Sequence, residues 1–360
     1  MFSNVFNKKK VLITGDTGFK GSWLAIWLNH LGSDVYGYAL PPITQNDNYV
    51  LTKLEEKIHH INGDVRDYNL FFKVFQEVNP DFAFHLAAQP LVIESYLNPR
   101  YTFETNLLGT MNFFESVRLT DSVKVAINIT SDKCYKNNEW VWGYRENDPM
   151  GGKDPYSASK GASELITNSY QHSFFEKLGT TNIAAARAGN VIGGGDWASY
   201  RIVPDFFKSI EKNEILQLRY PEATRPWQHV LEPLSGYLNL AMKLFIEGKV
   251  YSGGWNFGPI GTTNQTVRTL VERMITYSGK GKYEAPQFDD KFHEAGLLNL
   301  DISKAMHLLN WKPTLDFQDT IEFTVDGYLV NSSIDFYEAR ILQIEKYFNI
   351  ARKKEINWTK

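Results

Sequence analysis

The stretch VLITGDTGFKGSWLAIWLNHL, residues 11–31, decides the fold of this chain. A short apolar run at 11–14 precedes three glycines, and apolar residues at helical spacing follow from 22 to 31. This order predicts a strand, a tight turn and a helix whose N-terminus can attract a phosphate. A glycine pattern alone is weak evidence, because ordinary strand-to-helix turns also use glycine.

The same alternation of strand and helix continues along the chain. Further strands are predicted at 35–40, 58–61, 82–87, 123–129 and 183–188, and further helices at 70–78, 102–118 and 157–177. Such alternation favours an α/β protein with a Rossmann-type, doubly wound parallel sheet. Because the pattern loosens after about residue 190, we expect two domains. A dinucleotide-binding domain comprises 1–188 plus about 226–257, and a smaller mixed α/β substrate lobe comprises about 189–225 plus 258–360.

Composition excludes several classes of protein. The 360 residues are 43% hydrophobic and carry a net charge of -3, which permits a large core and gives no basic surplus for nucleic acid or membranes. The single cysteine, Cys134, excludes an intramolecular disulfide and suits the cytoplasm. The first ten residues lack the apolar stretch of a secretory signal, and no window approaches the roughly 20 apolar residues of a membrane span.

The reactive side chains are concentrated between residues 130 and 160. Ser131, Asp132 and Lys133 follow a predicted apolar strand, and ligands of open α/β sheets gather at such strand ends. Tyr156 and Lys160 are four positions apart, on one face of a helix. The ammonium is expected to lower the pKa of the phenol toward neutrality, giving a base for a hydroxyl proton.

The end of the second predicted strand bears on the choice of cofactor. The segment 36–40 lacks the acidic residue that usually binds the ribose of NAD, and no arginine or lysine follows through residue 50 to hold the extra phosphate of NADP. We therefore expect NAD. Asp16, inside the glycine loop, is either a substitute ribose ligand or a solvated loop aspartate.

Several motifs together resemble the extended short-chain dehydrogenase/reductase family. They are the glycine loop, Asp64-Val65, HLAA at 85–88, Asn106, Tyr156-x-x-x-Lys160 and NFGP at 256–259. Within that family, the triplet at 131–133 and the runs at 18–24, 139–148, 151–157, 190–197 and 225–230 resemble nucleotide-sugar 4,6-dehydratases that take a CDP-hexose.

The resemblance implies bound NAD, a nucleotide-sugar substrate and no metal. Cofactor residues would be Gly15, Asp16, Thr17, Gly18, Phe19, Lys20, Gly21, Asp64, Val65, Leu86, Ala87, Ala88, Asn106, Tyr156 and Lys160. Substrate residues would be Gln89, Asn190, Trp197, Arg201, Arg225, His293 and Glu294. The helices at 102–118 and 157–177 would pair in a homodimer, although their apolar stripe (Phe103, Leu107, Met111, Phe114) also fits packing on the sheet.

The implied reaction is an internal oxidation at C4 of the sugar, loss of water across C5 and C6, and reduction at C6. Tyr156 would take the O4 proton, assisted by Lys160 and Ser131, and Asp132 would give a proton to O6. The family places a glutamate, the C5 base, where this chain has Lys133. The lysine is therefore a neutral amine base with a depressed pKa, a cation that stabilises the enolate, or a plain ion-pair partner of Asp132.

Two other functions fit parts of the pattern. A C4 epimerase or another 4,6-dehydratase of the family would share Tyr156 and Lys160, but an epimerase has no need of the Asp132–Lys133 pair. A non-catalytic NAD-binding sensor or scaffold would share only the fold, and the intact reactive residues argue against it. Ile93 stands where relatives tend to have an arginine, which bears on the substrate.

Overall fold

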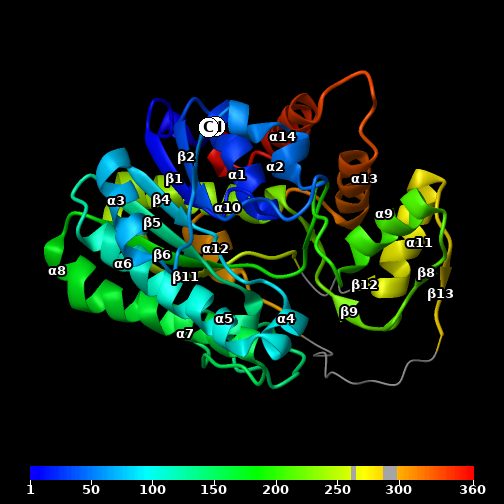
Figure 1. Ribbon diagram of the computed structural model, residues 1–360, viewed down its shortest axis with the longest axis horizontal. Coiled ribbons are helices and arrows are strands. Elements are labelled where there is room, and N and C mark those ends of the chain that lie inside the picture. Colours follow the sequence, from blue (N-terminus) through cyan, green and yellow to red (C-terminus); the bar gives the residue numbers. More distant parts are fainter. Residues whose placement is uncertain (261–264, 287–297) are drawn as a thin grey trace.

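A seven-stranded parallel sheet forms the centre of the computed structural model, which describes residues 1–260, 265–286 and 298–360 (Figure 1). The strand order is β11-β6-β5-β4-β1-β2-β3, and every neighbouring pair is parallel. The strands are β1 (Lys10–Thr14), β2 (Asp34–Ala39), β3 (His59–Asn62), β4 (Phe82–His85), β5 (Val125–Ile129), β6 (Asn182–Arg187) and β11 (Gly253–Asn256). The order reverses between β1 and β4, where such sheets bind ligands. The predicted Rossmann-type fold is confirmed.

Helices cover both faces of the sheet, because the central strands are buried at consecutive positions and successive side chains point to opposite faces. Val11 and Ile13 face a core formed with α1 (Phe19–His30), α10 (Leu231–Glu247) and α14 (Phe336–Lys353). Leu12 faces the opposite core, formed with α3 (Tyr68–Val78), α6 (Gly109–Arg118) and α7 (Pro155–Tyr170). The C-terminal helix α14 thus returns to lie against α1 (Figure 1).

The two long helices predicted at 102–118 and 157–177 each contain a π turn. The first runs from α5 (Pro99–Phe103) through a π turn at Glu104–Leu108 into α6. The second runs from α7 through a π turn at Gln171–Phe175 into α8 (Glu176–Leu178). Asn106 lies in the first π turn, where its buried amide donates to Ser159 Oγ at 2.8 Å. Such turns often occur at functional sites.

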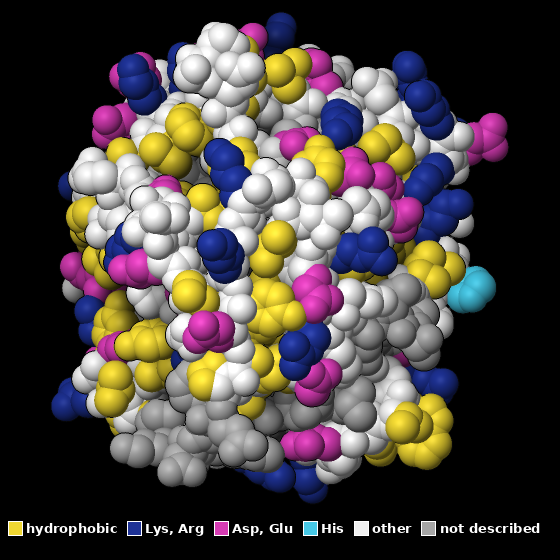
Figure 2. Space-filling view, turned by 90° about the vertical axis from the view of Figure 1, so that its right-hand side faces the viewer, with side chains coloured by type: hydrophobic (Ala, Val, Ile, Leu, Met, Phe, Trp, Pro, Cys, Tyr) yellow, Lys and Arg dark blue, Asp and Glu magenta, His cyan; other side chains and the backbone are white. Residues whose placement is uncertain are grey.

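The second lobe has its own core, between α9 (Ile202–Lys212), α11 (Val267–Ser278) and α13 (Phe317–Tyr328). Its short strands pair as β7 (Val191–Ile192) with β10 (Gln228–His229), β8 (Leu216–Gln217) with β13 (Tyr283–Glu284), and β9 (Thr224–Arg225) with β12 (Gln265–Thr266). The remaining short helices are α2 (Asn48–Leu51), α4 (Val92–Leu97) and α12 (Ser303–Leu308). On the face that this lobe presents, basic and acidic side chains are interspersed (Figure 2). Within the described residues, no helix has both the length and the apolar character needed to span a membrane.

A buried ion pair joins the sheet to α7. Arg187, the last residue of β6, donates from Nε and Nη2 to the two carboxylate oxygens of Glu164, each at 2.8 Å. The two side chains are only 5% and 4% exposed. Burial favours a neutral arginine, but the carboxylate outweighs it and raises the pKa of Arg187. Thr130, just after β5, donates to the same carboxylate. The pair therefore fixes α7 against the ends of β5 and β6.

We predict that Arg187→Met lowers the free energy of unfolding by about 3–5 kcal/mol, because it leaves the buried Glu164 carboxylate without its ion-pair partner. Urea denaturation followed by circular dichroism measures this change. Lys73→Met, which removes the exposed Lys73–Glu77 pair, is the control and should change stability little. Adding Glu164→Leu to Arg187→Met should restore part of the loss. If Arg187→Met and Lys73→Met lower the free energy of unfolding equally, the buried Arg187–Glu164 pair does not have the stabilising role assigned to it.

Candidate active site

The glycine loop makes a tight turn directly after β1. Gly15 has a φ of +77° and donates its N–H to Tyr38 O at 2.9 Å. A Cβ on Gly15 would lie 2.8 Å from Ala87 N, and one on Gly21 would lie 2.0 Å from Gly15 O. Only glycine fits at these two positions. Gly18 differs, because it is exposed and precedes the first turn of α1. The turn therefore leaves a helix N-terminus open to an anionic ligand.

Side chains around the loop hold neighbouring strand ends together. Thr14 Oγ1 accepts from the backbone N–H groups of Leu86 and Ala87, each at 3.1 Å, which brings the end of β4 beside the loop. Thr17 Oγ1 donates to Leu40 O at 2.9 Å, which ties the loop to the end of β2. The predicted cofactor residues of the glycine loop and of 86–87 are thus brought together.

Asp64 and Val65, two of the predicted cofactor residues, follow β3. Burial favours the neutral form of Asp64, but bonds from Arg66 outweigh it and lower the pKa of the carboxyl. The two side chains form an ion pair at 2.6 Å. Val65 is buried, and its side chain leaves no room for a Cβ on Gly109 of α6.

Asp16 is fully buried, so the interpretation as a solvated loop aspartate is wrong. Its Oδ2 lies 2.7 Å from His60 Nδ1. Its Oδ1 is buried and has no hydrogen-bond partner among the described residues. A buried acceptor without a donor is unfavourable, and a ligand hydroxyl could supply the missing bond. The glycine cradle and this oxygen fit a dinucleotide.

The Ser131–Lys133 triplet lies where β5 ends. Ser131 Oγ donates to Asp132 Oδ1 at 2.8 Å and accepts from Lys133 N at 3.3 Å. A Cβ on Gly189, just beyond β6, would lie 2.0 Å from Asp132 Oδ2. The missing side chain at 189 therefore provides the space for the Asp132 carboxylate.

Tyr156 and Lys160 lie in the first turns of α7. Asp154 caps this helix by accepting from Ser157 N at 2.9 Å, and Pro155 occupies the first helical position. Both reactive side chains are buried, 7% and 6% exposed, which keeps water from their polar ends.

Burial controls the ionisation of the tyrosine and the lysine. It raises the pKa of Tyr156 to about 12, while the hydrogen bond with Ser131 and the charge of Arg201 oppose the shift. It lowers the pKa of Lys160 to about 8, against the attraction of Glu164. The expectation that Lys160 brings the pKa of the phenol toward neutrality is therefore wrong for this structure. Desolvation of the phenolate outweighs the neighbouring cations.

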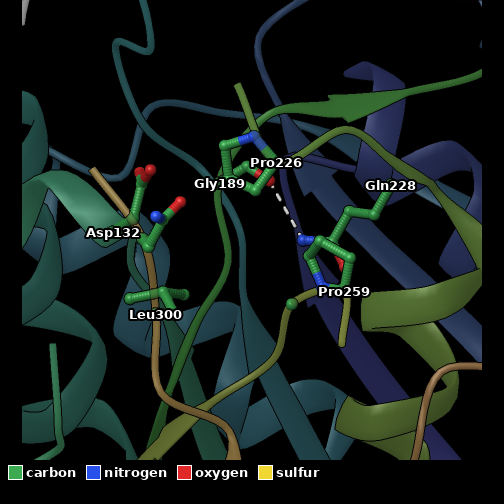
Figure 3. Close-up of a pocket in the computed structure, with 8 residues that line it drawn as sticks. Asp132, Gly189, Pro226, Gln228, Pro259 and Leu300 are labelled. Carbon is green, nitrogen blue, oxygen red and sulfur yellow. Dashed lines mark hydrogen bonds between the residues drawn. The ribbon is translucent and has the colours of Figure 1, made fainter. Parts of the chain in front are cut away.

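A small cavity separates Asp132 from the second lobe (Figure 3). It is lined by Asp132, Gly189, Pro226, Gln228, Gly258, Pro259, Asn299 and Leu300. Gln228 Nε2 donates to Gly189 O at 3.0 Å, as the dashed line marks. Asp132 thus faces the gap between the sheet edge and the lobe, where a substrate held by both parts would lie.

Positive charge gathers around Asp132. Burial lowers the pKa of Lys20 to about 7, the charges of Lys160 and Arg201 add to the shift, and Asp132 opposes it. Lys20 therefore extends from the glycine loop toward the reactive residues. Lys133 is half-buried, and the ion pairs of the described residues do not include one between Lys133 and Asp132. The interpretation of Lys133 as a plain partner of Asp132 is not supported.

Some predicted substrate residues are occupied by contacts within the protein. The Gln89 amide donates to Thr102 Oγ1 at 2.8 Å and accepts from Leu91 N at 2.6 Å, inside the turn after β4. Trp197 packs edge-on against Tyr328, with ring centroids 5.3 Å apart. Direct contact of Gln89 or Trp197 with a substrate stays a prediction.

The structure describes three of the five other residues that were predicted to bind substrate. Arg201 pairs with Asp196 at 2.8 Å and is close enough to Tyr156 to affect its ionisation. Arg225 lies in β9, where its Nη1 donates to Thr224 O, and Asn190 has a left-handed backbone with φ of +50°. His293 and Glu294 lie outside the described residues.

Sequence reasoning missed three residues that shape the site. Glu164 follows Lys160 by one helical turn, so the helical spacing gave a signal for it. Arg187 and His60 lie on strands whose local sequence pattern gave no signal for either residue.

Asn106 was predicted as a cofactor residue, yet its Oδ1 accepts from Gln89 N at 2.8 Å and its amide bonds to α7. It joins the turn after β4 to the helix that carries Tyr156.

A Rossmann sheet with a glycine loop beside a Tyr-x-x-x-Lys helix defines the extended short-chain dehydrogenase/reductase class. Residues 12–324 match the family model described as GDP-mannose 4,6 dehydratase, and the chain belongs to that family.

Similar proteins agree with this assignment. A CDP-glucose 4,6-dehydratase of Salmonella typhimurium is 46% identical over 88% of this chain and 90% of its own length. A dTDP-glucose 4,6-dehydratase of Xanthomonas campestris is 25% identical over 89% of this chain and 93% of its own. Among solved structures, an epimerase of Methanothermobacter thermautotrophicus has the same fold, with a TM-score of 0.78 at 24% identity and 96% of each chain covered.

We predict that Gly18→Ala lowers the affinity for NAD by roughly tenfold or more, with folding intact. The added Cβ would lie 3.3 Å from Gly15 O and meet little else in the protein, so the main obstruction would fall on a bound phosphate. Gly21→Ala is the comparison, and it should lower stability as well because its Cβ collides with the loop backbone. Titration calorimetry and thermal unfolding separate the two effects. Unchanged NAD affinity in Gly18→Ala would contradict the assignment of the glycine loop as the phosphate-binding site.

Proposed function

We propose that this chain converts CDP-D-glucose to CDP-4-keto-6-deoxy-D-glucose, as a hydro-lyase that keeps NAD tightly bound. The observation that carries the proposal is the position of Asp132. Its buried carboxylate lies beside Ser131, close enough to Tyr156 to influence the phenol, and faces the cavity below the second lobe. A plain oxidoreductase needs the tyrosine and the lysine, whereas loss of water needs an additional acid. The choice of CDP rests on the Salmonella relative.

The glycine loop, Asp64, Val65 and the backbone at 86–88 would hold the cofactor, and Lys160 would contact its ribose. Bound NAD supplies the acceptor and donor of hydride that an internal oxidation and reduction require. Because the same cofactor is used in both halves of the cycle, the net reaction is elimination of water.

Tyr156 would take the proton from O4 of the hexose as hydride leaves C4. The product keeps a ketone at C4, so this proton does not go back to O4 and passes to solvent before the next turnover. With a pKa of about 12 the phenol is mostly neutral at pH 7, so groups that favour the phenolate matter. Ser131 and Arg201 both act in that direction. Lys160, with a pKa of about 8, is still largely protonated at pH 7 and lies one helical turn away. Ser131 would also orient the sugar oxygen.

Asp132 would protonate the leaving O6 hydroxyl. The C5 proton needs a separate base, and Lys133 occupies the position of the family's glutamate. Two roles for Lys133 remain: a neutral amine that takes the C5 proton, or a cation that stabilises the enolate while water or Asp132 moves the proton.

We predict that Lys133→Met abolishes exchange of the C5 proton if the amine is the base. The measurement is incorporation of deuterium at C5 from D₂O, read by NMR. Lys136→Met, a change of an exposed lysine three residues along, is the matched control and should exchange at the wild-type rate. Exchange at an unchanged rate in Lys133→Met would exclude the amine as the base and leave the enolate role.

The test of the proposed function is incubation with CDP-, dTDP-, UDP- and GDP-linked hexoses, followed by the absorbance of the 4-keto-6-deoxy product in alkali. We expect product from CDP-glucose. Activity confined to another nucleotide would overturn the substrate assignment, and interconversion of glucose and galactose without water loss would favour a C4 epimerase. Asp132, which epimerisation does not need, argues against that alternative.

Further features of the proposal concern the whole protein. The lobe built on α9, α11 and α13 would bind the nucleotide sugar, through Arg201, Arg225 and Asn190, while the Rossmann part holds NAD. A homodimer is supported by exposed apolar side chains on the paired helices, namely Phe103, Leu108, Met111, Leu165 and Phe174, although Phe114 of the predicted stripe is buried. Light scattering of the purified chain tests it. A cytoplasmic location and a role in deoxysugar synthesis for lipopolysaccharide O-antigens would follow from the proposed reaction.

A further inference from the structure

The end of β2 lacks an acid, yet a carboxylate occupies the same face of the strand. Gly37 and Ala39 are two positions apart and so point to one face. Ala39 stands where the ribose-binding acid is expected. A Cβ on Gly37 would lie 2.1 Å from Asp16 Oδ2, so the glycine provides the space into which the Asp16 carboxylate extends. The charge missing from β2 is therefore supplied from the neighbouring loop.

Two side chains of β3 extend this polar group toward solvent. In the parallel register His60 lies beside Gly37, and Asn62 lies beside Ala39. His60 Nδ1 contacts Asp16 Oδ2 at 2.7 Å, and its Nε2 contacts Asn62 Oδ1 at 3.2 Å. Exposure increases along the series: the Asp16 side chain is 0% exposed, that of His60 is 12% exposed, and Asn62 is an exposed residue.

We infer that Asp16, His60 and Asn62 together replace the missing acid of β2 and select NAD over NADP. This inference rests on the proposed function, because it concerns the same cofactor. Asn62, beside Ala39, contacts the adenosine ribose. Asp16 offers its Oδ1, which has no partner among the described residues, to a ribose hydroxyl. His60 acts as a positioning residue that orients Asn62 and sets the charge beneath the ribose.

Asp16, His60 and Asn62 form a hydrogen-bonded relay, and the charge of this relay depends on pH. Burial favours a neutral imidazole, but the bond to Asp16 outweighs it and raises the pKa of His60. Burial also raises the pKa of Asp16, against the opposing effect of His60. Of the other groups around the pair, the Tyr49 ring lies 5.2 Å from the His60 ring, and Glu55 adds negative charge near the imidazole. Such a pair titrates as a unit.

The sign of the pH effect follows from the raised pKa of His60. Below that pKa the imidazolium and the carboxylate cancel, and above it the relay carries a net negative charge. A negative relay repels the 2′-phosphate of NADP but not the 2′-hydroxyl of NAD. Preference for NAD should therefore increase as the pH rises through the pKa of His60.

The experiment measures dissociation constants of NAD and NADP by calorimetry between pH 7 and pH 9, above the second ionisation of a phosphate monoester at about 6. The wild type should gain several-fold in preference for NAD across this range. His60→Gln keeps a hydrogen-bond donor for Asp16 but cannot titrate, so its preference should be flat. His59→Gln is the matched control, because His59 is adjacent on β3 and pairs with Asp34 instead. It should keep the wild-type profile.

The outcomes separate this inference from the proposed function. If His60→Gln shows the same pH dependence of cofactor preference as the wild type, the proposed role of the relay is overturned. The proposal that the protein binds NAD is not affected by that result. Binding of neither dinucleotide by the wild type overturns the proposed function as well. If His60→Gln fails to fold, Asn62→Ala, at the exposed end of the relay, tests the inference instead. It should weaken NAD binding several-fold with unchanged thermal stability, and unchanged affinity would overturn the ribose contact.

Discussion

The buried pair of Arg187 and Glu164 is the interaction on which the position of the reactive groups depends. Neither charge would be tolerated alone at this depth, because the desolvation of an unpaired ion is large. The pair forms only when the end of β6 meets α7 at one register. Glu164 lies two helical turns beyond Tyr156, and Thr130, which immediately precedes Ser131, bonds to the same carboxylate. One electrostatic constraint thus sets the distance between the tyrosine helix and the serine-aspartate turn.

Local periodicity predicts the fold because the pattern that buries each element is contained within it. The predicted strand at 11–14 is β1 (Lys10–Thr14), and the predicted helix at 70–78 is α3 (Tyr68–Val78). The segment at about 226–257, expected in the dinucleotide-binding domain, supplies α10, which packs in the core beside β1, and the edge strand β11. The π turns were not predicted, and the bond that Asn106 of the first π turn makes to Ser159 joins residues far apart in sequence.

The site could be predicted as a set of residue types but not as an electrostatic environment. Tyr156 and Lys160 are at the expected positions, yet the pKa of the phenol moves opposite to the expectation. Spacing on a helix reveals which groups are neighbours and gives no measure of how much water they lose. The same limit applies to Gln89, because its spacing does not reveal that its amide bonds to Thr102 of α5 and to Leu91.

Lys133 places a basic side chain next to Asp132, where the family resemblance implies a glutamate. The charges of Lys160, Arg201 and Asp132 all act on Lys20, so cations outnumber the carboxylate in this group. A nucleotide diphosphate brings negative charge into the gap between the sheet and the lobe. Charge supplied by the substrate would offset this surplus of positive charge.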